Sequence, residues 1–515
     1  MLFNSHVFVL AFLPITMLGF FLLGRLHSTR AARLWLVAAS LVFYGWWSWL
    51  YLGLLLLSML ANFTLGNAIL SAREGAPGRA RALVAGGVAA NVALLGWYKY
   101  ATFVAENVTA LTGIEFAVGG VVLPLAISFY TFLQIAYLVD CGRGRAERYS
   151  FLDYVLFVSF FPHLIAGPIV HHHELIPQFQ QRENFRFRAP DVAAGLAFFA
   201  IGLMKKLLIA DPVGALATPV FAGAALEGAA PGLVESWTAA TAFSVGLYYD
   251  FSAYSDMAVG LARMFGIRFP YNFNSPYKAV SIIDFWRRWH MTLSRFLRDY
   301  VYIPLGGNRR GASRRHMNLM ATMLLGGLWH GAGWTFVIWG GLHGFYLLVN
   351  HAWSGAAARA RAEGRSLGLG AAPARVLTLL AVVVAWVFFA APSLGSALAV
   401  LGGMAGLNGF AQPETALLLA TALRGPGALA GAIGGMATLS WAISLGMLGL
   451  ALLIIALAPN SQQIVDGRAA EIDEPRRWPR LHFRPRLVSA CATAGAFLLA
   501  LALMADVKEF VYFQF

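Results

Sequence analysis

Cysteine is almost absent from the 515-residue sequence, and charged residues are scarce. The two cysteines, Cys141 and Cys491, lie far apart and belong to no Cys-x-x-Cys or Cys/His pattern, which argues against a disulfide framework and a cysteine zinc site. Charged residues make up 12% of the chain and hydrophobic residues 59%, whereas soluble globular proteins contain roughly 25% charged residues. This composition excludes an ordinary soluble domain and predicts an all-α, multi-pass membrane protein.

The hydrophobic residues are grouped into runs that approach the length of about 20 residues needed for a membrane-spanning helix. Such runs lie near 7–24, 31–49, 50–70, 82–100, 119–140, 192–212, 236–262, 317–350, 376–392, 394–410, 438–458 and 487–505. We expect about 11–13 transmembrane helices from these runs, with 317–350 forming a broken pair. The first run lacks a basic leader and is expected to be a retained helix.

The arginines that contribute to the net charge of +14 are concentrated in short loops between apolar runs. Alternate loops carry Arg25, Arg30 and Arg33, then Arg73, Arg79 and Arg81, then Arg143, Arg145 and Arg148. By the positive-inside rule these loops are expected to be cytoplasmic and the amino terminus outside. Membrane topology therefore explains the basicity better than nucleic-acid binding, which we do not expect.

The segment 263–315 interrupts the apolar pattern with many basic side chains. They are Arg263, Arg268, Lys278, Arg287, Arg288, Arg295, Arg298, Arg309, Arg310, Arg314 and Arg315, against Asp284 and Asp299. One interpretation is a cytoplasmic loop attracted to anionic membrane lipid. The other is a site for an anionic, phosphate-bearing cofactor, because the arginine side chain matches the geometry of phosphate oxygens.

Within this segment, Ser281 followed by Asp284 has the spacing of a helix N-cap, so we expect a helix to begin there. At 100° per residue its apolar face carries Trp286, Trp289, Leu293 and Leu297, and a neighbouring face carries Arg287, Ser294 and Arg298. His290 lies at the border between these faces. It is expected either to reach into an apolar pocket or to be a structural histidine bonded to a backbone carbonyl.

His330 lies in the nearly uncharged run LWHGAGWTFVIWGGLHGF. An ionisable side chain at membrane depth is costly, which makes it a functional-site hypothesis. The surrounding glycines permit a helix break and close approach of a substrate. A neutral imidazole can take the proton of a hydroxyl near pH 7, so we predict that His330 is a general base.

Other polar residues in apolar surroundings are interpreted as structural. Asp250 and Asp256 are expected on different faces of a helix, each paired with an arginine of the basic segment. The backbone around His163 is expected to be kinked by the adjacent proline, and His343 is expected to pack or form a hydrogen bond. The consecutive histidines 171–173 diverge by 100° per residue on a helix and lack supporting cysteine or carboxylate spacing, so we expect no metal site.

Several motifs follow one another along the chain in a specific order. They are SFYTFLQIAYLVD at 128–140, FFPHLIAGPI at 160–169, YDFSAYSDMA at 249–258, YNFNSPYKAVSIIDFWRRWHMTLSRFLRDYVYIPLGGN at 271–308 and LWHGAGWTFVIWGGLHG at 328–344. This succession resembles the membrane-bound O-acyltransferases, most closely the bacterial alginate O-acetyltransferase branch, with the D-alanyl transferase of teichoic acid as a cousin. The terminal VYFQF is also similar to that branch, whereas 354–440 match no pattern.

The resemblance implies a ring of membrane helices around a thinned centre, with a cytoplasmic funnel that leads to the catalytic histidine. It places that histidine at His330 and a second family position at His290, where eukaryotic members commonly carry asparagine. Because of that asparagine, His290 is expected to orient or form a hydrogen bond rather than to exchange protons, and either His290 or nearby backbone amides are expected to hold the acceptor or the developing oxyanion. We expect a single membrane domain, 1–515, with a family-like core at about 119–350, amino-terminal helices in 1–118 and carboxyl-terminal helices in 351–515.

The expected acyl donor is acetyl-coenzyme A. Its phosphates are expected near Arg287, Arg288, Arg295 and Arg298, with Trp329 also at the donor site and no metal. The acceptor is expected across the membrane, because secreted polysaccharides such as alginate are modified outside. The resemblance implies an extracytoplasmic, SGNH-hydrolase-like partner, association with polysaccharide biosynthesis and secretion machinery, and a place in the bacterial inner membrane.

Two other functions remain open from the sequence. A transporter of polysaccharide or lipid-linked sugar would show inverted repeats with paired broken helices, and no self-similarity between the two halves is evident. An intramembrane metallohydrolase would be built on the histidine cluster at 171–173. Flux without acetyl-coenzyme A would favour the transporter, and a stoichiometric metal would favour the metallohydrolase.

Overall fold

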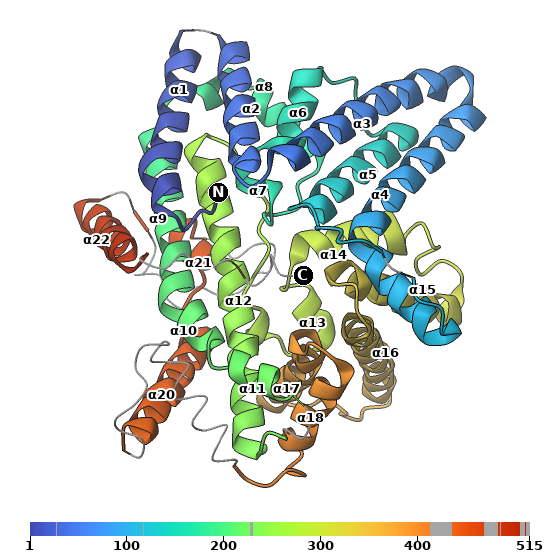
Figure 1. Ribbon diagram of the computed structural model, residues 1–515, viewed down its shortest axis with the longest axis vertical. Coiled ribbons are helices and arrows are strands. Elements are labelled where there is room, and N and C mark those ends of the chain that lie inside the picture. Colours follow the sequence, from blue (N-terminus) through green and yellow to red (C-terminus); the bar gives the residue numbers. More distant parts are fainter. Residues whose placement is uncertain are drawn as a thin grey trace.

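The computed structural model describes residues 1–26, 28–116, 118–226, 230–411, 435–467, 483–484, 486–504 and 510. Within these residues every regular element is a helix, as Figure 1 shows. The all-α architecture expected from composition is therefore confirmed. The terminal VYFQF motif lies outside the described residues.

The amino-terminal part of the chain forms mainly long helices. These are α1 (Leu13–Arg25), preceded by the π-helical turn η1 (Phe8–Phe12), α2 (Thr29–Gly45), α3 (Trp49–Gly75), α4 (Pro77–Thr112) and α5 (Ile127–Arg143). Local sequence sets their ends. The hydroxyl of Ser48 accepts a hydrogen bond from the amide of Tyr51 at the start of α3, and Gly113 ends α4 with a φ of 71°, a left-handed conformation that favours glycine.

Short helices and two long ones form the middle of the chain. They are α6 (Phe151–Ser159), α7 (Phe161–Leu164), α8 (His172–Gln180), η2 (Arg182–Phe185), α9 (Ala189–Lys205), η3 (Lys206–Ala210), α10 (Asp211–Gly214), α11 (Thr218–Gly223) and α12 (Leu233–Met264). The break between α6 and α7 falls beside Pro162 and His163, which confirms the kink expected there.

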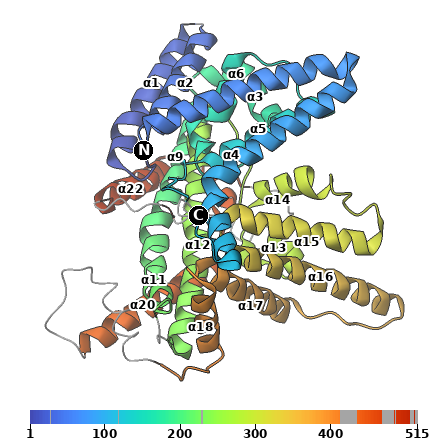
Figure 2. The same ribbon diagram turned by 45° about the vertical axis from the view of Figure 1, so that its right-hand side comes forward.

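The remaining elements run from the basic segment to the carboxyl-terminal region. They are η4 (Pro276–Lys278), α13 (Ile282–Trp286), α14 (Met291–Leu297), η5 (Arg298–Tyr302), α15 (Gly311–His330), α16 (Trp334–Ala362), α17 (Ala371–Ala390), α18 (Leu394–Met404), α20 (Gly435–Leu457), α21 (Ser461–Val465) and α22 (Leu487–Leu503). Figure 2 shows α14, α15, α16 and α17 grouped on one side of α12.

Five described helical stretches are long and apolar enough to cross a membrane: Phe8–Arg25, Trp49–Gly75, Pro77–Thr112, Ala189–Gly223 and Ala371–Ala390. The expected number of about 11–13 full spans is larger. Some expected spans form shorter helices, such as α18, which has 11 residues in place of the run 394–410. The long helix α12, which the run 236–262 predicted, is not among these five and carries Glu235, Asp250, Asp256 and Arg263.

Helix α12 is buried along nearly its whole length and packs most extensively against α9. A Cβ atom on Gly195 would lie 2.6 Å from the carbonyl oxygen of Gly260, so the two backbones approach too closely for a larger residue. Two lysines, one at the end of α9 and one in η3, form ion pairs with the two aspartates of α12. The expected pairing of Asp250 and Asp256 with arginines of the basic segment is wrong, because Lys206 and Lys205 lie closer, each with its Nζ 2.7 Å from the carboxylate.

Helices α15 and α16 form the broken pair expected for 317–350. The chain is extended at Gly331 and Gly333, with φ values of −158° and −168°, before α16 begins. The two helices then touch through glycine, because a Cβ atom on Gly327 would lie 2.3 Å from the carbonyl oxygen of Phe336. This contact fixes the direction in which the end of α15 points.

The helix expected from Ser281 begins as predicted but ends early. The hydroxyl of Ser281 accepts a hydrogen bond from the amide of Asp284, and α13 follows. A continuous helix through residue 298 is wrong, because α13 ends at Trp286 and α14 starts at Met291. The helix is interrupted because the amide of Met291 donates to the carbonyl of Asn272 in the preceding loop, at 2.9 Å, and not to a carbonyl of α13.

Candidate active site

His330 is the last residue of α15 and is 6% exposed. Three aromatic rings surround its imidazole, with centroids 4.9 Å away for Trp329, 5.1 Å for Trp339 and 5.2 Å for Phe389, all in edge-on arrangements. These rings come from α15, α16 and α17, so the packing of three helices sets the position of one imidazole. Such aromatic surroundings suit a neutral imidazole that accepts a proton.

His290 reaches the same aromatic cluster from a different part of the chain. It precedes α14 and adopts a left-handed backbone conformation, φ 40° and ψ 54°, which is uncommon for a residue with a side chain. Its ring lies 4.7 Å from that of Phe251 and 6.4 Å from that of Trp329. Trp329 thus contacts both histidines, and the structure brings together the two residues assigned to catalysis by sequence.

Lys99 is a residue of this site that the sequence analysis missed. From α4 its ammonium donates to the carbonyls of Trp329 at 2.5 Å and His330 at 3.1 Å. The hydroxyl of the next residue, Tyr100, donates to the carbonyl of Leu328 at 2.7 Å. The signal was present, because a lysine inside an apolar run is costly unless it has partners.

A cavity of about 520 Å³ leads to His330. Its lining includes Lys99, Trp329 and His330 together with Met1, Trp46, Trp47 and residues 123–129. Met1 and Trp46 lie at the ends of the first two helices opposite to the loop that carries Arg25 and Arg30. Part of the cavity lining therefore lies at the helix ends that the topology argument expects outside the cell.

His343, in α16, has a hydrogen-bonding role. The indole nitrogen of Trp286 donates to its Nδ1 at 3.2 Å, and its ring packs against Trp339 with centroids 4.9 Å apart. His343 therefore accepts a hydrogen bond from a tryptophan and packs in the aromatic cluster, in agreement with the packing or hydrogen-bonding role expected from the sequence.

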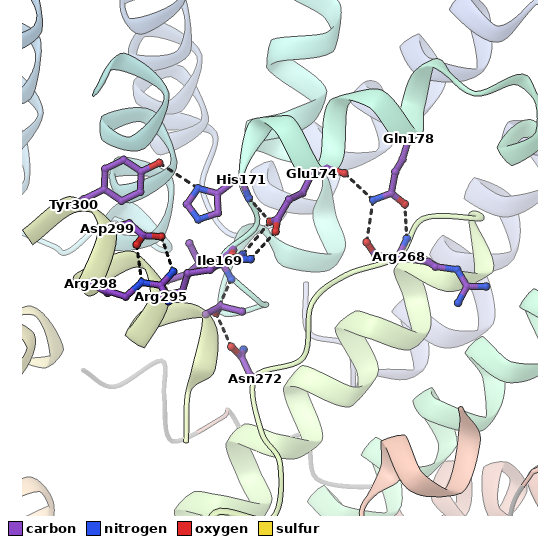
Figure 3. Close-up of polar contacts among 11 residues, drawn as sticks. Ile169, His171, Glu174, Gln178, Arg268, Asn272, Arg295, Arg298, Asp299 and Tyr300 are labelled. Atoms are coloured by element: carbon purple, nitrogen blue, oxygen red, sulfur yellow. Dashed lines mark hydrogen bonds and ion pairs between the residues drawn. The ribbon is translucent and has the colours of Figure 1, made fainter. Parts of the chain in front are cut away.

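Three of the four arginines expected near phosphate groups are engaged with carboxylates. Arg295 donates two hydrogen bonds to the carboxylate of Glu174, with nitrogen–oxygen distances of 2.5 and 2.9 Å. Figure 3 shows this pair. Arg298 is paired with Asp299, its neighbour in sequence, at 2.7 Å, and Arg288 is paired with Asp284 at 2.8 Å. The fourth, Arg287, is exposed and makes no ion pair with any described residue.

The carboxylate of Glu174 is held ionised by this contact. Burial favours its neutral form, but the hydrogen bonds and charge of Arg295 outweigh burial and lower the pKa of Glu174 below its usual value. Arg295 also donates to the carbonyl of Ile169 at 3.3 Å, and the amide of His171 donates to Glu174 at 2.9 Å (Figure 3). The pair therefore links α14 to the segment before α8.

Two of the histidines at 171–173, His172 and His173, lie near the carboxylate of Asp140. His171 is extended at the N-cap of α8, so the 100° spacing does not apply to it. One potential ligand atom each from Asp140, His172 and His173 lies within 4.8 Å of the others. His172 is already bonded at both ring nitrogens, to Tyr149 at 2.9 Å and Asp140 at 3.2 Å. The absence of a metal here stays a prediction.

Comparison with known proteins gives concordant matches. The model of the membrane-bound O-acyltransferase family matches residues 34–389. A peptidoglycan O-acetyltransferase from Helicobacter pylori is 44% identical over 436 residues, covering 79% of this chain and 80% of the relative. A probable alginate O-acetylase from Pseudomonas putida is 40% identical and covers 78% of this chain and 80% of the relative. A teichoic acid D-alanyltransferase from Streptococcus thermophilus is 26% identical over 44% of this chain and 57% of the relative.

Proposed function

Because the chain belongs to the membrane-bound O-acyltransferase family, we propose that it transfers an acetyl group from cytoplasmic acetyl-coenzyme A for O-acetylation of a glycan outside the cell membrane. The observation that carries this proposal is the position of His330. Its imidazole is buried among three aromatic rings and also lines the cavity that opens beside the amino terminus. A proton acceptor in a dry site at the end of a cavity is what transfer to a hydroxyl requires.

The reaction follows from the chemistry of these side chains. His330 takes the proton of the acceptor hydroxyl while the hydroxyl oxygen bonds to the thioester carbon. The tetrahedral intermediate collapses by breaking the carbon–sulfur bond, and the proton returns from His330 to the departing thiolate, so the histidine ends neutral. His290, whose ring also lies near that of Trp329, is proposed to orient the acceptor or to donate to the developing oxyanion.

Acetyl-coenzyme A is proposed to approach through the basic segment. Arg287 is proposed to bind its phosphates, since it is exposed and Arg288, Arg295 and Arg298 are each paired with a carboxylate. Trp329 is proposed to contact the acetyl end, because it lies against His330 and lines the cavity. Replacement of Arg287 by alanine should raise KM for acetyl-coenzyme A more than it lowers kcat.

The acceptor polymer is proposed from the relatives. The most similar ones named above act on peptidoglycan and alginate, which are both glycans that carry hydroxyl groups outside the cytoplasm. We therefore propose a bacterial inner-membrane location and an extracytoplasmic, SGNH-hydrolase-like partner within the polysaccharide machinery, which receives the acetyl group and places it on sugar hydroxyls. Mass spectrometry of peptidoglycan and exopolysaccharide from cells with and without the protein identifies the polymer.

The proposed role of His330 is tested by His330→Gln in membranes or detergent. We expect the variant to insert and fold while acetyl transfer falls at least about 100-fold, the scale on which a general base contributes. His351→Gln is the matched control, because His351 lies in α16 beyond the aromatic cluster. Full transfer by folded His330→Gln would remove His330 as the base, whatever polymer is acetylated.

A further inference from the structure

The last turn of α15 receives its hydrogen bonds from α4. The final carbonyls of a helix have no partner within that helix, and the extended glycine Gly331 prevents the chain from capping them itself. The ammonium of Lys99 donates hydrogen bonds to the carbonyls of Trp329 and His330, and the hydroxyl of Tyr100 donates one to the carbonyl of Leu328. Two adjacent residues of one helix thus cap three successive carbonyls of another.

From this geometry we infer that Lys99 is a positioning residue for acetyl transfer, which holds the backbone of His330 so that its imidazole faces the cavity. The inference rests on the proposed function of His330. A cation suits this place because the carboxyl end of a helix carries partial negative charge. The ammonium also lies 5.9 Å from the centre of the Trp329 ring and 3.5 Å from the hydroxyl of Ser128, at the start of α5.

The location of Lys99 argues against a role in stability alone. Its side chain crosses from the membrane helix α4 to the one turn of α15 that ends in His330, and it lines the same cavity as that histidine. Burial of an ammonium is costly, and a neutral residue could pack α4 against α15 without this cost. The bonds go to the backbone of His330, so any shift of the ammonium moves the base itself.

Lys99→Met tests the inference by removing the donors while keeping much of the apolar side chain. Purified protein is assayed for acetyl transfer at varied acetyl-coenzyme A. We expect kcat to fall about 100-fold, because a displacement of about 1 Å of a catalytic group costs that much. KM should change less than about threefold, since Arg287, the residue proposed to bind the phosphates of the donor, is unchanged. Lys99→Arg, which restores a cationic donor, should recover at least about tenfold of the lost kcat.

Trp237→Phe is the matched control. The indole of Trp237 donates to the carbonyl of Met404 at 3.0 Å, so it caps the carboxyl end of α18 as Lys99 caps α15, but far from the proposed base. Its replacement removes one partly buried cap and should leave kcat within about twofold, because the cost of a lost hydrogen bond of about 1 kcal/mol falls on stability. An equal loss of kcat in both variants would make Lys99 merely structural.

Failure of this inference is distinguishable from failure of the proposed function. If His330→Gln is inactive but folded Lys99→Met retains kcat within about threefold, only the role of Lys99 is overturned. If His330→Gln is active, the base assignment itself fails. Should Lys99→Met not fold, Tyr100→Phe removes the neighbouring bond to Leu328. A several-fold lower kcat at unchanged KM is then expected, and unchanged kcat would contradict the inference.

Discussion

The ion pair of Arg295 and Glu174 tests whether an arginine of the basic segment 263–315 binds phosphate or stabilises the fold. Both side chains are about a quarter exposed, 27% and 28%, and their two contacts join α14 to the start of α8 (Figure 3). We predict that Glu174→Gln and Arg295→Met each destabilise the protein. Neither variant should raise KM for acetyl-coenzyme A more than about twofold if the pair is structural.

The magnitude follows from burial and geometry. Removal of one member of a fully buried pair costs about 3–5 kcal/mol, because the other charge is left uncompensated. Here both groups keep partial access to water, which screens the exposed charge, so we expect a cost of about 1–3 kcal/mol for each single variant. The double variant Glu174→Gln/Arg295→Met should cost less than the sum, because the second substitution removes a group that has already lost its partner.

The effect should also depend on pH in one direction. The pKa of Glu174 is lowered in the folded protein, so its pairing contributes stability above the unfolded pKa of about 4.3 and loses it as pH falls through the folded value. The difference in stability between the native protein and Glu174→Gln should therefore be full at pH 7 and shrink below about pH 4. Thermal or denaturant unfolding of the purified variants at both pH values measures it.

Two results would contradict a structural role for the Arg295–Glu174 pair. If Arg295→Met raised KM tenfold or more without loss of stability, Arg295 would contact the donor, and the pairing with Glu174 would be a resting contact. A pH-independent difference between the native protein and Glu174→Gln would likewise refute the electrostatic argument.

Other regions of the protein give three shorter predictions. Gly340→Ala should destabilise the protein by about 1–3 kcal/mol or lower its yield, because the new Cβ would lie 2.4 Å from the carbonyl oxygen of Met323. Gly341→Ala should be tolerated, because its new Cβ would lie 3.5 Å from the side chain of Leu324, its nearest neighbour. Lys206→Met should cost about 3–5 kcal/mol in unfolding measurements, because it leaves Asp250 buried without its ammonium partner. Purified protein should contain less than one metal per chain and keep its activity after chelation, since the hydrogen bonds of His172 occupy both ring nitrogens.

Local signals in the sequence were sufficient for features that depend on neighbouring residues. The glycines after His330 predicted the break between α15 and α16, and Ser281 predicted the start of α13. Apolar runs predicted the helical membrane architecture, although run length alone could not tell a full span from a short helix such as α18.

Features that depend on distant residues could not be predicted in the same way. The break at His290 arises because the amide of Met291 bonds the carbonyl of Asn272 in the preceding loop, and the partners of Asp250 and Asp256 come from the end of α9 and from η3. Lys99 contacts carbonyls about 230 residues away in sequence. No spacing rule relates such pairs, and only the packing of α4 against α15 reveals the contact.

A structure with a non-hydrolysable analogue of acetyl-coenzyme A tests the central claim most directly. A base lies within about 3 Å of the hydroxyl it deprotonates, and that oxygen lies about 3–3.5 Å from the carbon it attacks. The account therefore predicts the thioester carbon of the analogue within about 6 Å of the His330 imidazole, with the cavity beside Lys99 left open to the acceptor. A thioester bound elsewhere, with Trp329 and His330 untouched, would contradict it.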